Sequence, residues 1–248
     1  MRAAAVPMRS HRDAGGLSDA AIGPGSRLFF EGVADDQLAC VRSCLGAQLF
    51  SFERGDEILA CSAERSYYGV LDSGVAFDVR RHANGDRTLV DVVEPGDLLG
   101  EGWRAGRWNG AEPPRERAVV GAAPGTVLLL DPSRLSDPSV ACPAKISVQT
   151  SLLRSVLHKE ERLRAKLEIL RHRSLRSRIG SYLIVESQRR GSERFSLPLS
   201  RAELAEYLHA DRAAVSRELA RMRDDGLIEF HRNSFVLRDL DETVLEVA

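Results

Sequence analysis

The sequence lacks several features that would assign it to a common functional class. It has no run of about 18 apolar residues, the length that suggests a membrane-spanning helix. It has no phosphate-binding loop, no nucleophile elbow and no paired residues for acid–base catalysis, which argues against an enzyme. Residues 1–25 are rich in Ala, Gly and Pro without a sustained apolar core, so we interpret them as a flexible arm rather than a signal peptide. We therefore expect a cytoplasmic protein that is not an enzyme and has no membrane partner.

Cysteine is scarce, and the sequence leaves its role open. The chain has four cysteines: Cys40, Cys44, Cys61 and Cys142. In a cytoplasmic protein, we expect thiols or ligands rather than structural disulfides. Cys40 and Cys44 lie one helical turn apart, so both could face a metal. A metal or iron–sulfur site, a reversible thiol switch and plain apolar packing stay open as alternatives. The six histidines show no His-x-x-x-His or comparable ligand spacing.

Net charge is also nearly absent, at −1, but the charges are unevenly distributed. Residues 154–223 contain 17 Lys and Arg against 9 Asp and Glu, and the rest of the chain contains 18 against 27. This basic segment is typical of a module that binds a polyanion. A solvated helix surface is the alternative.

Residues 28–135 have the pattern of a β domain. Short apolar runs alternate with turn residues, and Asn84-Gly85 between two such runs predicts a hairpin with a type I′ turn. Strands at this spacing indicate a sandwich or a barrel-like roll. A short helix over 34–45 is expected before them, with Asp35 or Asp36 as its cap.

A long helix is expected after Pro143. Residues 144–170 contain no Gly or Pro, and positions 146, 149, 153, 156, 160, 163, 167 and 170 follow a heptad spacing. Gln149 and Glu160 are the two polar members of this seam. The apolar members, our candidate dimerisation residues, are Ile146, Leu153, Val156, Leu163, Leu167 and Leu170. The seam pairs either with a second copy of the chain or with the β domain.

Residues 200–223 predict two short helices joined by a tight turn, after an amphipathic helix over 174–188. Ser200 and Glu203 have the spacing of a capping box, and Asp211 is placed to cap the second helix. The inward-facing residues are Leu204, Ala205 and Leu208 in the first helix and Val215, Leu219 and Met222 in the second. The helix ends at Gly226, and two short strands follow as a wing.

This arrangement predicts a helix-turn-helix whose second helix enters the major groove of DNA. Arg212, Ser216 and Arg217 lie on its outer face; arginine can bind guanine, and Ser216 and Arg201 are placed to hold phosphates. Two alternatives remain open. The pair could be an αα-hairpin in a protein-binding domain, and Arg217 could pair with Asp211 or Glu218.

At these residues the chain resembles the CRP/FNR superfamily of bacterial transcription regulators. The resemblance rests on "LSRAELAEYLHADRAAVSRELARMRDDGLIEF", on the long helix, on "VVEPGDLLGE" and on the early β pattern, and it covers nearly all of the chain after residue 28. It implies an α+β fold with an N-terminal β-roll of the cupin-like, cyclic-nucleotide-binding-domain type, a long dimerisation helix and a C-terminal winged helix-turn-helix. The implied domains are an arm over 1–25, a sensor over 26–142, a dimerisation helix over 143–171 and a DNA-binding domain over 172–248.

The resemblance also implies a function. A homodimer would bind a pseudo-palindromic site on double-stranded DNA, act with RNA polymerase and respond to a small molecule or a redox signal at the roll. The candidate DNA-binding residues are Ser200, Arg201, Arg212, Ala213, Ser216 and Arg217. Ala213 stands where many members carry a glutamate that accepts from cytosine, so base preference there is expected to change.

The expected effector is a small molecule whose identity the sequence leaves open. The Gly-Glu element of cyclic-nucleotide binders is present as Gly100-Glu101, but Glu116-Arg117 occupies the position of their phosphate-binding Arg-Ser pair. An acid there would repel the cyclic phosphate, unless Arg115 or Arg117 substitutes after a register shift. The cysteine spacing does not match that of the iron–sulfur sensors of the family. A cyclic-nucleotide-binding regulatory protein, a haem protein and an iron–sulfur or thiol redox sensor remain as alternatives.

Overall fold

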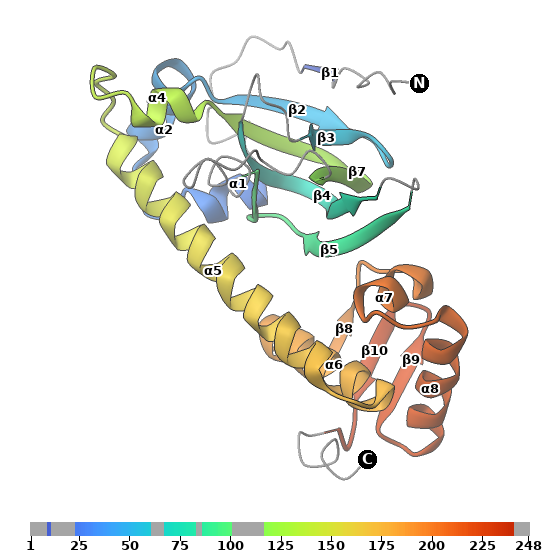
Figure 1. Cartoon of the computed structure of the whole chain (residues 1–248). Coiled ribbons are helices and arrows are strands. Elements are labelled where there is room, and N and C mark those ends of the chain that lie inside the picture. Colours follow the sequence, from blue (N-terminus) through green and yellow to red (C-terminus); the bar gives the residue numbers. More distant parts are fainter. Residues whose placement is uncertain (1–8, 11–22, 61–66, 83–85, 101–116, 241–248) are drawn as a thin grey trace. The chain divides into compact units, whose positions relative to one another are not determined.

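The computed structural model of this 248-residue chain describes residues 9–10, 23–60, 67–82, 86–100 and 117–240. The chain forms two compact units, Met1–Lys159 and Glu160–Ala248, and helix α5 (Lys145–Arg171) runs from one into the other (Figure 1). No helix in the described ranges is long and apolar enough to cross a membrane.

The first unit is a β-roll with short helices, as the sequence predicts. Its two longest strands, β4 (Tyr68–Arg81) and β7 (Arg117–Leu130), pair antiparallel along their length. The sheet order is β1-β2-β7-β4-β5, with β3 added on β7 and β6 on β4 (Figure 1). The other elements are β1 (Arg9–Ser10), α1 (Pro24–Phe29), α2 (Asp35–Leu45), β2 (Gln48–Phe52), β3 (Glu57–Ala60), β5 (Arg87–Val93), β6 (Leu98–Leu99) and α4 (Pro132–Ser136).

Irregularities in the middle of β4 and β7 turn the sheet into a roll. The register of their pairing shifts three times between Leu71 and Ala76. Gly74 has φ +84°, and a Cβ there would lie 2.5 Å from the Pro124 carbonyl oxygen, so only glycine fits. Such bulges bend a strand and increase its twist. As a result the first half of β7 pairs with β3 and its last half with β2.

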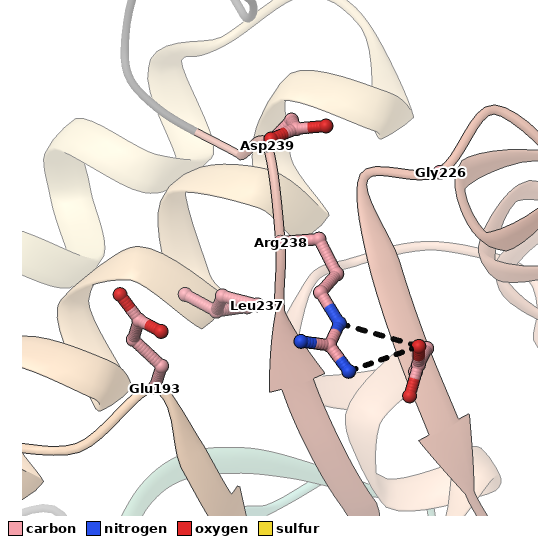
Figure 2. A pocket seen from close by; sticks show the side chains of 6 residues that line it. Glu193, Gly226, Leu237, Arg238 and Asp239 are labelled. Atoms are coloured by element: carbon pink, nitrogen blue, oxygen red, sulfur yellow. Dashed lines mark hydrogen bonds and ion pairs between the residues drawn. The ribbon is translucent and has the colours of Figure 1, made fainter.

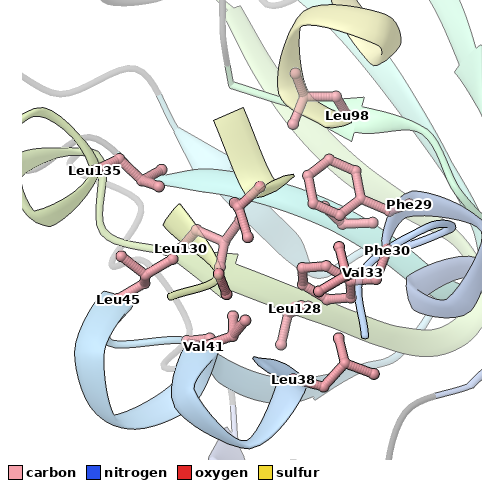
Figure 3. Close-up of a cluster of buried hydrophobic side chains, with 14 residues drawn as sticks. Phe29, Phe30, Val33, Leu38, Val41, Leu45, Leu98, Leu128, Leu130 and Leu135 are labelled. Carbon is pink, nitrogen blue, oxygen red and sulfur yellow. The ribbon is translucent and has the colours of Figure 1, made fainter. Parts of the chain in front are cut away.

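Two apolar cores lie on opposite sides of β4 and β7. Successive strand residues point to opposite faces, so Leu128 and Leu130 pack under the helices, whereas Val127 and Leu129 pack inside the roll. Figure 3 shows the cluster under the helices, which includes Phe29, Phe30, Val33, Leu38, Val41, Leu45, Leu98, Leu128, Leu130 and Leu135. The start of α5 joins this cluster through Val148, which is fully buried.

Two local predictions have different outcomes. β4 and β5 form the predicted hairpin, with Arg81 opposite Arg87, although the Asn84-Gly85 turn itself lies outside the described residues. The capping prediction for α2 was wrong. The helix begins at Asp35, so Ala34 is its N-cap, and this residue makes no side-chain hydrogen bond to the first turn. Asp35 and Asp36 are the first and second residues of the helix, one and two positions too late for an N-cap.

The second unit is a winged helix-turn-helix, built after α5 from α6 (Leu175–Arg190), α7 (Arg201–Tyr207) and α8 (Arg212–Asp224). Its sheet has the order β8-β10-β9, from β8 (Arg194–Ser196), β9 (Ile228–His231) and β10 (Ser234–Leu237). The sequence predicts only two of these strands. It misses β8 because this three-residue strand lies among Arg, Gly and Ser residues, and only its pairing with β10 defines it.

Candidate nucleic-acid interface

The two helices α7 and α8 are capped as the sequence predicts. The Glu203 N–H donates to Ser200 Oγ at 3.3 Å, and the Ser200 N–H donates to Glu203 Oε2 at 2.7 Å, which completes the capping box. Asp211 accepts from the Ala214 N–H at 3.0 Å at the start of α8. Because side chains satisfy both N-termini, the position at which each helix begins is well defined.

The turn between the helices is tight and depends on a small residue. Ala205 is 2% exposed, and its carbonyl oxygen accepts from the Ala210 N–H at 2.9 Å. His209 in the turn adopts φ +50°, a left-handed conformation that is uncommon outside glycine. The small side chain of Ala205 lets α8 cross α7 closely, which fixes the direction in which α8 projects its outer face.

Helix α8 has one buried and one exposed face. Val215, Leu219 and Met222 are fully buried, as the sequence predicts. Four of the candidate DNA-binding residues, which lie on the same helix, are exposed: Arg212, Ala213, Ser216 and Arg217. Within the described part of the chain, the guanidinium groups of Arg212 and Arg217 have no hydrogen-bond or ion-pair partner. Their charges are therefore available to an external anion.

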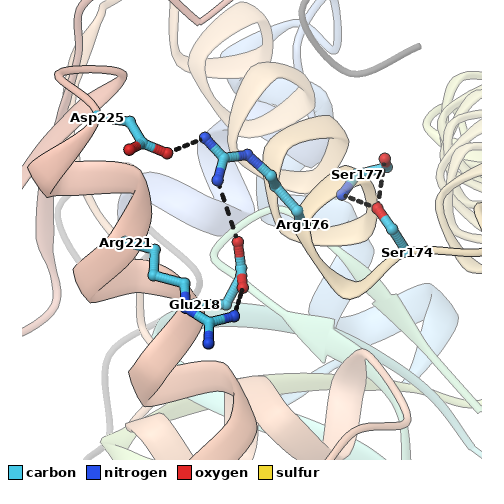
Figure 4. Close-up of polar contacts among 6 residues, drawn as sticks. All are labelled: Ser174, Arg176, Ser177, Glu218, Arg221 and Asp225. Carbon is cyan, nitrogen blue, oxygen red and sulfur yellow. Dashed lines mark hydrogen bonds and ion pairs between the residues drawn. The ribbon is translucent and has the colours of Figure 1, made fainter. Parts of the chain in front are cut away.

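The carboxylates close to these arginines in sequence are engaged elsewhere. Figure 4 shows Glu218 between two arginines: Arg176 of α6 at 3.4 Å and Arg221 at 3.2 Å. Arg176 also pairs with Asp225, the residue that follows α8, so this one side chain joins α6 to α8 at two carboxylates. Asp211 is used as the helix cap. The alternative in which Arg217 pairs with Asp211 or Glu218 is thus not realised. The sequence does not identify Arg176, because nothing in its own helix pattern indicates a partner 42 residues away.

The two candidate serines have different hydrogen bonds. Ser216 Oγ donates to the Arg212 carbonyl oxygen at 2.9 Å, so its proton is used within the helix. Ser200 is exposed, and its oxygen accepts from the Glu203 N–H. A hydroxyl that only accepts still has its own proton to donate. Of the two, Ser200 is therefore better prepared to donate to a phosphate.

Arg201 contacts the wing, which the sequence did not predict. Its Nη2 donates to the carbonyl oxygen of Arg232 at 2.8 Å, and Arg232 has φ +52° at the tip of the β9–β10 turn. The guanidinium lies 4.9 Å from the Phe230 ring centre and 5.1 Å from that of Phe235. Burial lowers the pKa of Arg201 from its ordinary value because it disfavours the charged form. The group remains a cation at neutral pH.

A shallow hollow at the base of the wing does not suit a nucleic acid. It measures about 450 Å³ and is lined by Glu193, Gly226, Glu229, Leu237, Arg238 and Asp239 (Figure 2). Three of these residues are acidic, and its one arginine, Arg238, pairs with Glu229 at 3.1 Å. Carboxylates repel phosphate, so this surface is separate in chemistry from the outer face of α8.

In the first unit, the effector candidate Arg117 is part of a buried ionic group. Its guanidinium pairs with Asp78 of β4, which is 2% exposed, and Lys159 Nζ of α5 lies 3.7 Å from the same carboxylate. Two cations therefore share one buried acid. The sequence indicates Arg117 through the family resemblance, but it does not indicate Asp78 or Lys159, because each fits the expected strand or helix pattern without any sign of a distant partner. Gly100 is buried with φ +79°, and Glu101 and Arg115 lie outside the described residues.

The heptad seam of α5 is largely exposed. Within the described chain, the exposed fractions are 76% for Ile146, 61% for Leu153, 40% for Val156, 36% for Leu163 and 63% for Leu167, and Leu170 is half-buried. Leu157, which the heptad spacing does not include, is 55% exposed beside them. These are large apolar side chains in water, which a soluble monomer rarely gathers in one stripe.

Three of the four cysteines can be described. Cys40 and Cys44 lie on α2 and Cys142 lies before α5; all three are half-buried free thiols. Among the residues that the structure describes, no group of three or more His, Cys, Asp or Glu side chains is arranged to hold a metal ion. Cys61 lies outside these residues, so the four-cysteine set stays untested.

Comparison with known proteins connects this geometry to a family. Residues 177–242 match the model of the Crp-like helix-turn-helix domain, a range that contains α7, α8 and the wing. A curated relative from Rhizobium leguminosarum bv. viciae, named "Probable transcriptional activator", is 27% identical over 77% of each chain. The transcriptional activator protein FnrL of Cereibacter sphaeroides is 22% identical over 75% of each chain. The chain is thus similar to transcription regulators of the CRP/FNR type, and its residues 177–242 match a Crp-like helix-turn-helix domain.

Solved structures of CRP/FNR regulators share the fold of this chain. FixK2 from Bradyrhizobium japonicum is 20% identical with a TM-score of 0.63, over 81% of this chain and 96% of FixK2. The c-di-GMP-responsive regulator CLP from Xanthomonas campestris is 16% identical with a TM-score of 0.61, over 79% of this chain and 96% of CLP. These likenesses confirm the α+β architecture, with a β-roll before the winged helix-turn-helix.

Proposed function

We propose that this CRP/FNR protein is a homodimeric transcription regulator that binds a pseudo-palindromic DNA site through α8. The observation that carries the proposal is the pair of exposed, unpaired arginines, Arg212 and Arg217, on a capped helix whose neighbouring acids are engaged elsewhere. A helix of this kind fits the major groove, where arginine can bind guanine O6 and N7. The proposal is for a binding protein, not an enzyme, acting in the cytoplasm.

The two arginines contribute differently in this proposal. They are five residues apart, which separates their directions by about 140° on a helix. One side chain therefore cannot duplicate the contact of the other. We assign base reading to Arg217 and a contact shared between base edge and phosphate to Arg212. Ala213 offers only a methyl group, so we expect no preference for cytosine through an acceptor at that position.

The phosphate contacts come from the start of α7 in this proposal. The Ser200 hydroxyl still has a proton to donate, and Arg201 uses one of its five N–H donors on the Arg232 carbonyl. Arg201 can then hold the wing turn and one phosphate together. Ser216 can donate to a DNA phosphate only if its hydroxyl gives up the hydrogen bond to the Arg212 carbonyl oxygen.

Dimerisation through α5 is the second part of the proposal. The exposed apolar stripe of Leu153, Val156, Leu163 and Leu167 would be covered by the same helix of a second copy. Two DNA-reading heads related by a two-fold axis match a pseudo-palindromic site. Because two curated relatives are named activators, we include contact with RNA polymerase in this proposal.

The β-roll is the proposed sensor, and its effector is a small molecule or a redox signal. Cyclic AMP is disfavoured, because the Arg117 charge is already committed to Asp78 and Glu116 lies next to it in sequence. An effector that favours one arrangement of the two heads would act by shifting a population of conformers.

A DNA titration tests the proposed function. Fluorescence anisotropy would follow binding to a duplex selected from a random library and to its scrambled form, at several salt concentrations. We expect tighter binding to the selected duplex and a loss of affinity with salt. Arg217→Ala should cost roughly 1–3 kcal/mol on the selected duplex and flatten the preference at one base pair.

Arg238→Ala is the matched control for this titration. It removes one positive charge from the same unit, at a residue that pairs with Glu229 in the hollow rather than facing outward from α8. It should leave the preference between the duplexes unchanged. If Arg217→Ala weakens both duplexes alike, Arg217 is a phosphate contact. If the wild-type protein binds neither duplex in a salt-dependent way, the proposal fails and a regulatory protein acting on a protein partner becomes the better reading.

A further inference from the structure

The last turns of α5 carry a buried cation that contacts the helix-turn-helix. Residues from Glu160 onward belong to the second compact unit, and within it Lys166 is only 8% exposed. Its Nζ lies 3.8 Å from the centre of the Tyr207 ring, at the end of α7, and Tyr207 is also buried. An ammonium group is attracted to an aromatic face, and the attraction is stronger where both groups are removed from water.

A second aromatic ring supports Tyr207 from α6. Tyr182 is buried, and its ring centre lies 5.2 Å from that of Tyr207, with an angle of 47° between the ring planes. Tilted pairs at this distance are favourable for aromatic rings. Lys166, Tyr182 and Tyr207 thus join three helices in one buried group, which we call the aromatic contact group.

Hydrogen bonds connect the turn after α5 to the end of α7. Arg178 of α6 donates through Nε to the His172 carbonyl oxygen at 2.9 Å and through Nη1 to the Leu208 carbonyl oxygen at 3.4 Å. The Ser181 hydroxyl and His172 Nε2 lie 2.9 Å apart. Because His172 follows α5 and Leu208 follows α7, these bonds and the aromatic contact group attach α7 to the end of α5 at two separate places.

The same turns of α5 present the proposed dimer stripe on a different face. Leu163 and Leu167 are exposed, whereas Lys166 and Ile169 are buried. The exposed face is available to a second copy of the chain, and the buried face packs against the helices of its own unit. The tight turn at Ala205 joins α7 to α8, so the attachment of α7 to α5 also determines the direction in which α8 projects.

We propose that Lys166 is a positioning residue that determines which half-site spacing the protein accepts. Its contact with Tyr207 holds the helix-turn-helix on the dimerisation helix, while Lys166 itself does not contact DNA. The inference rests on the proposed function, because it requires a DNA-binding dimer through α5. Each added base pair moves one half-site by about 3.4 Å and turns it by about 35° around the DNA axis. A firmly attached head tolerates such a change less well than a loosely attached one.

Lys166→Met tests this role, because methionine keeps a similar length without the charge. Fluorescence anisotropy would follow the full-length protein on the selected duplex, on versions with one or two base pairs inserted between the half-sites, and on a single half-site. We expect the wild-type protein to lose affinity with each insertion. Lys166→Met should bind the selected duplex about tenfold more weakly and distinguish less between the spacings. Its affinity for the single half-site and its dimerisation, measured by sedimentation velocity, should stay unchanged.

Two further variants are controls for charge and for the cation. The chain has only three lysines, and all lie on α5, so Lys145→Met makes the same substitution in the same helix. Lys145 donates to the carbonyl oxygens of Asp137 and Val140 in the first unit, and its variant should keep the spacing preference. Lys166→Arg retains a cation that can lie over the Tyr207 ring, so it should also keep the preference.

The inference is overturned if the wild-type protein accepts every spacing equally, or if Lys166→Met keeps the wild-type preference. It is also overturned if Lys166→Met is a monomer or loses as much affinity for the single half-site as for the selected duplex, because Lys166 then supports the fold in general. If Lys166→Met fails to fold, Lys166→Arg decides: a retained preference supports the inference and a lost preference contradicts it. A wild-type protein that binds no duplex refutes the proposed function as well, whereas binding without a spacing preference refutes this inference alone.

Discussion

Arg117 of the first compact unit differs from Arg212 and Arg217 of the second in whether the fold gives its side chain a partner. In the first unit, Arg117 is directed to a buried carboxylate, Asp78, which it shares with Lys159. In the second unit, Arg212 and Arg217 point outward without a partner in the described structure, because Glu218 and Asp211 are engaged by other groups. An arginine identified by its place in a sequence pattern is thus available to a ligand only where the fold leaves it unpaired.

The same contrast applies to apolar side chains. The roll buries its leucines in two cores, whereas α5 leaves Ile146, Leu153 and Leu167 more than half exposed. Groups that the fold leaves unsatisfied, such as unpaired cations and uncovered leucines, are the best candidates for contact with DNA or a second chain. Four predictions test this distinction, in order of decreasing effect.

The largest effect is expected from a charge on the exposed α5 stripe. Leu163→Glu would bury an unpaired carboxylate at the proposed dimer interface, at a cost of several kcal/mol. Sedimentation velocity should then show a monomer, whereas we expect a dimer for the wild-type protein. Leu28→Glu, at a leucine of α1 that is 61% exposed but lies off the stripe, is the control and should stay dimeric. If the Leu163→Glu protein remains fully dimeric, the dimer interface does not include Leu163.

The next effect concerns the buried ionic group. Asp78→Ala leaves Arg117 and Lys159 without their shared partner, and we expect a loss of about 3 kcal/mol in the free energy of unfolding. Glu57→Ala removes the partner of Arg81 from a far more exposed pair and should cost less than about 1 kcal/mol. Urea denaturation would measure both. Equal losses would mean that burial does not distinguish the two ion pairs.

A smaller effect is expected at Arg201, which contacts the wing and faces the proposed DNA. Arg201→Ala should weaken both duplexes alike and reduce the salt slope by about one unit. It should also lower the free energy of unfolding by about 1 kcal/mol, because the aromatic and carbonyl contacts are lost. Arg201→Lys keeps the charge but not the planar stacking, so it should keep the salt slope while losing stability. If the salt slope of Arg201→Ala is unchanged, Arg201 stabilises the wing but does not contact a phosphate.

The smallest effect is expected from cyclic AMP. Because Arg117 is paired with Asp78 and Glu116 precedes it, isothermal calorimetry at millimolar cyclic AMP should give no saturable heat. Cyclic GMP carries the same cyclic phosphate on a different base. If it also fails to bind under the same conditions, the site excludes the phosphate and not only the adenine base. Micromolar binding of either nucleotide would show that Arg117 leaves its buried partner to meet a ligand, and would remove the contrast between the units.

Much of the fold and of the candidate site follows from the sequence because the deciding forces are local. The capping box at Ser200, the Asp211 cap, the buried face of Val215, Leu219 and Met222, and the α5 heptad depend on residues only a few positions apart. The same holds for the hairpin between β4 and β5. Helix and strand periodicity encode such features directly.

Only the tertiary structure decides which charged groups find partners. Asp78 and Arg117 are 39 residues apart, Arg176 and Glu218 are 42 apart, and Arg201 reaches Arg232 across 31. A hydrogen bond or ion pair forms over a few ångströms of space, and no local pattern records which distant group the fold will bring there.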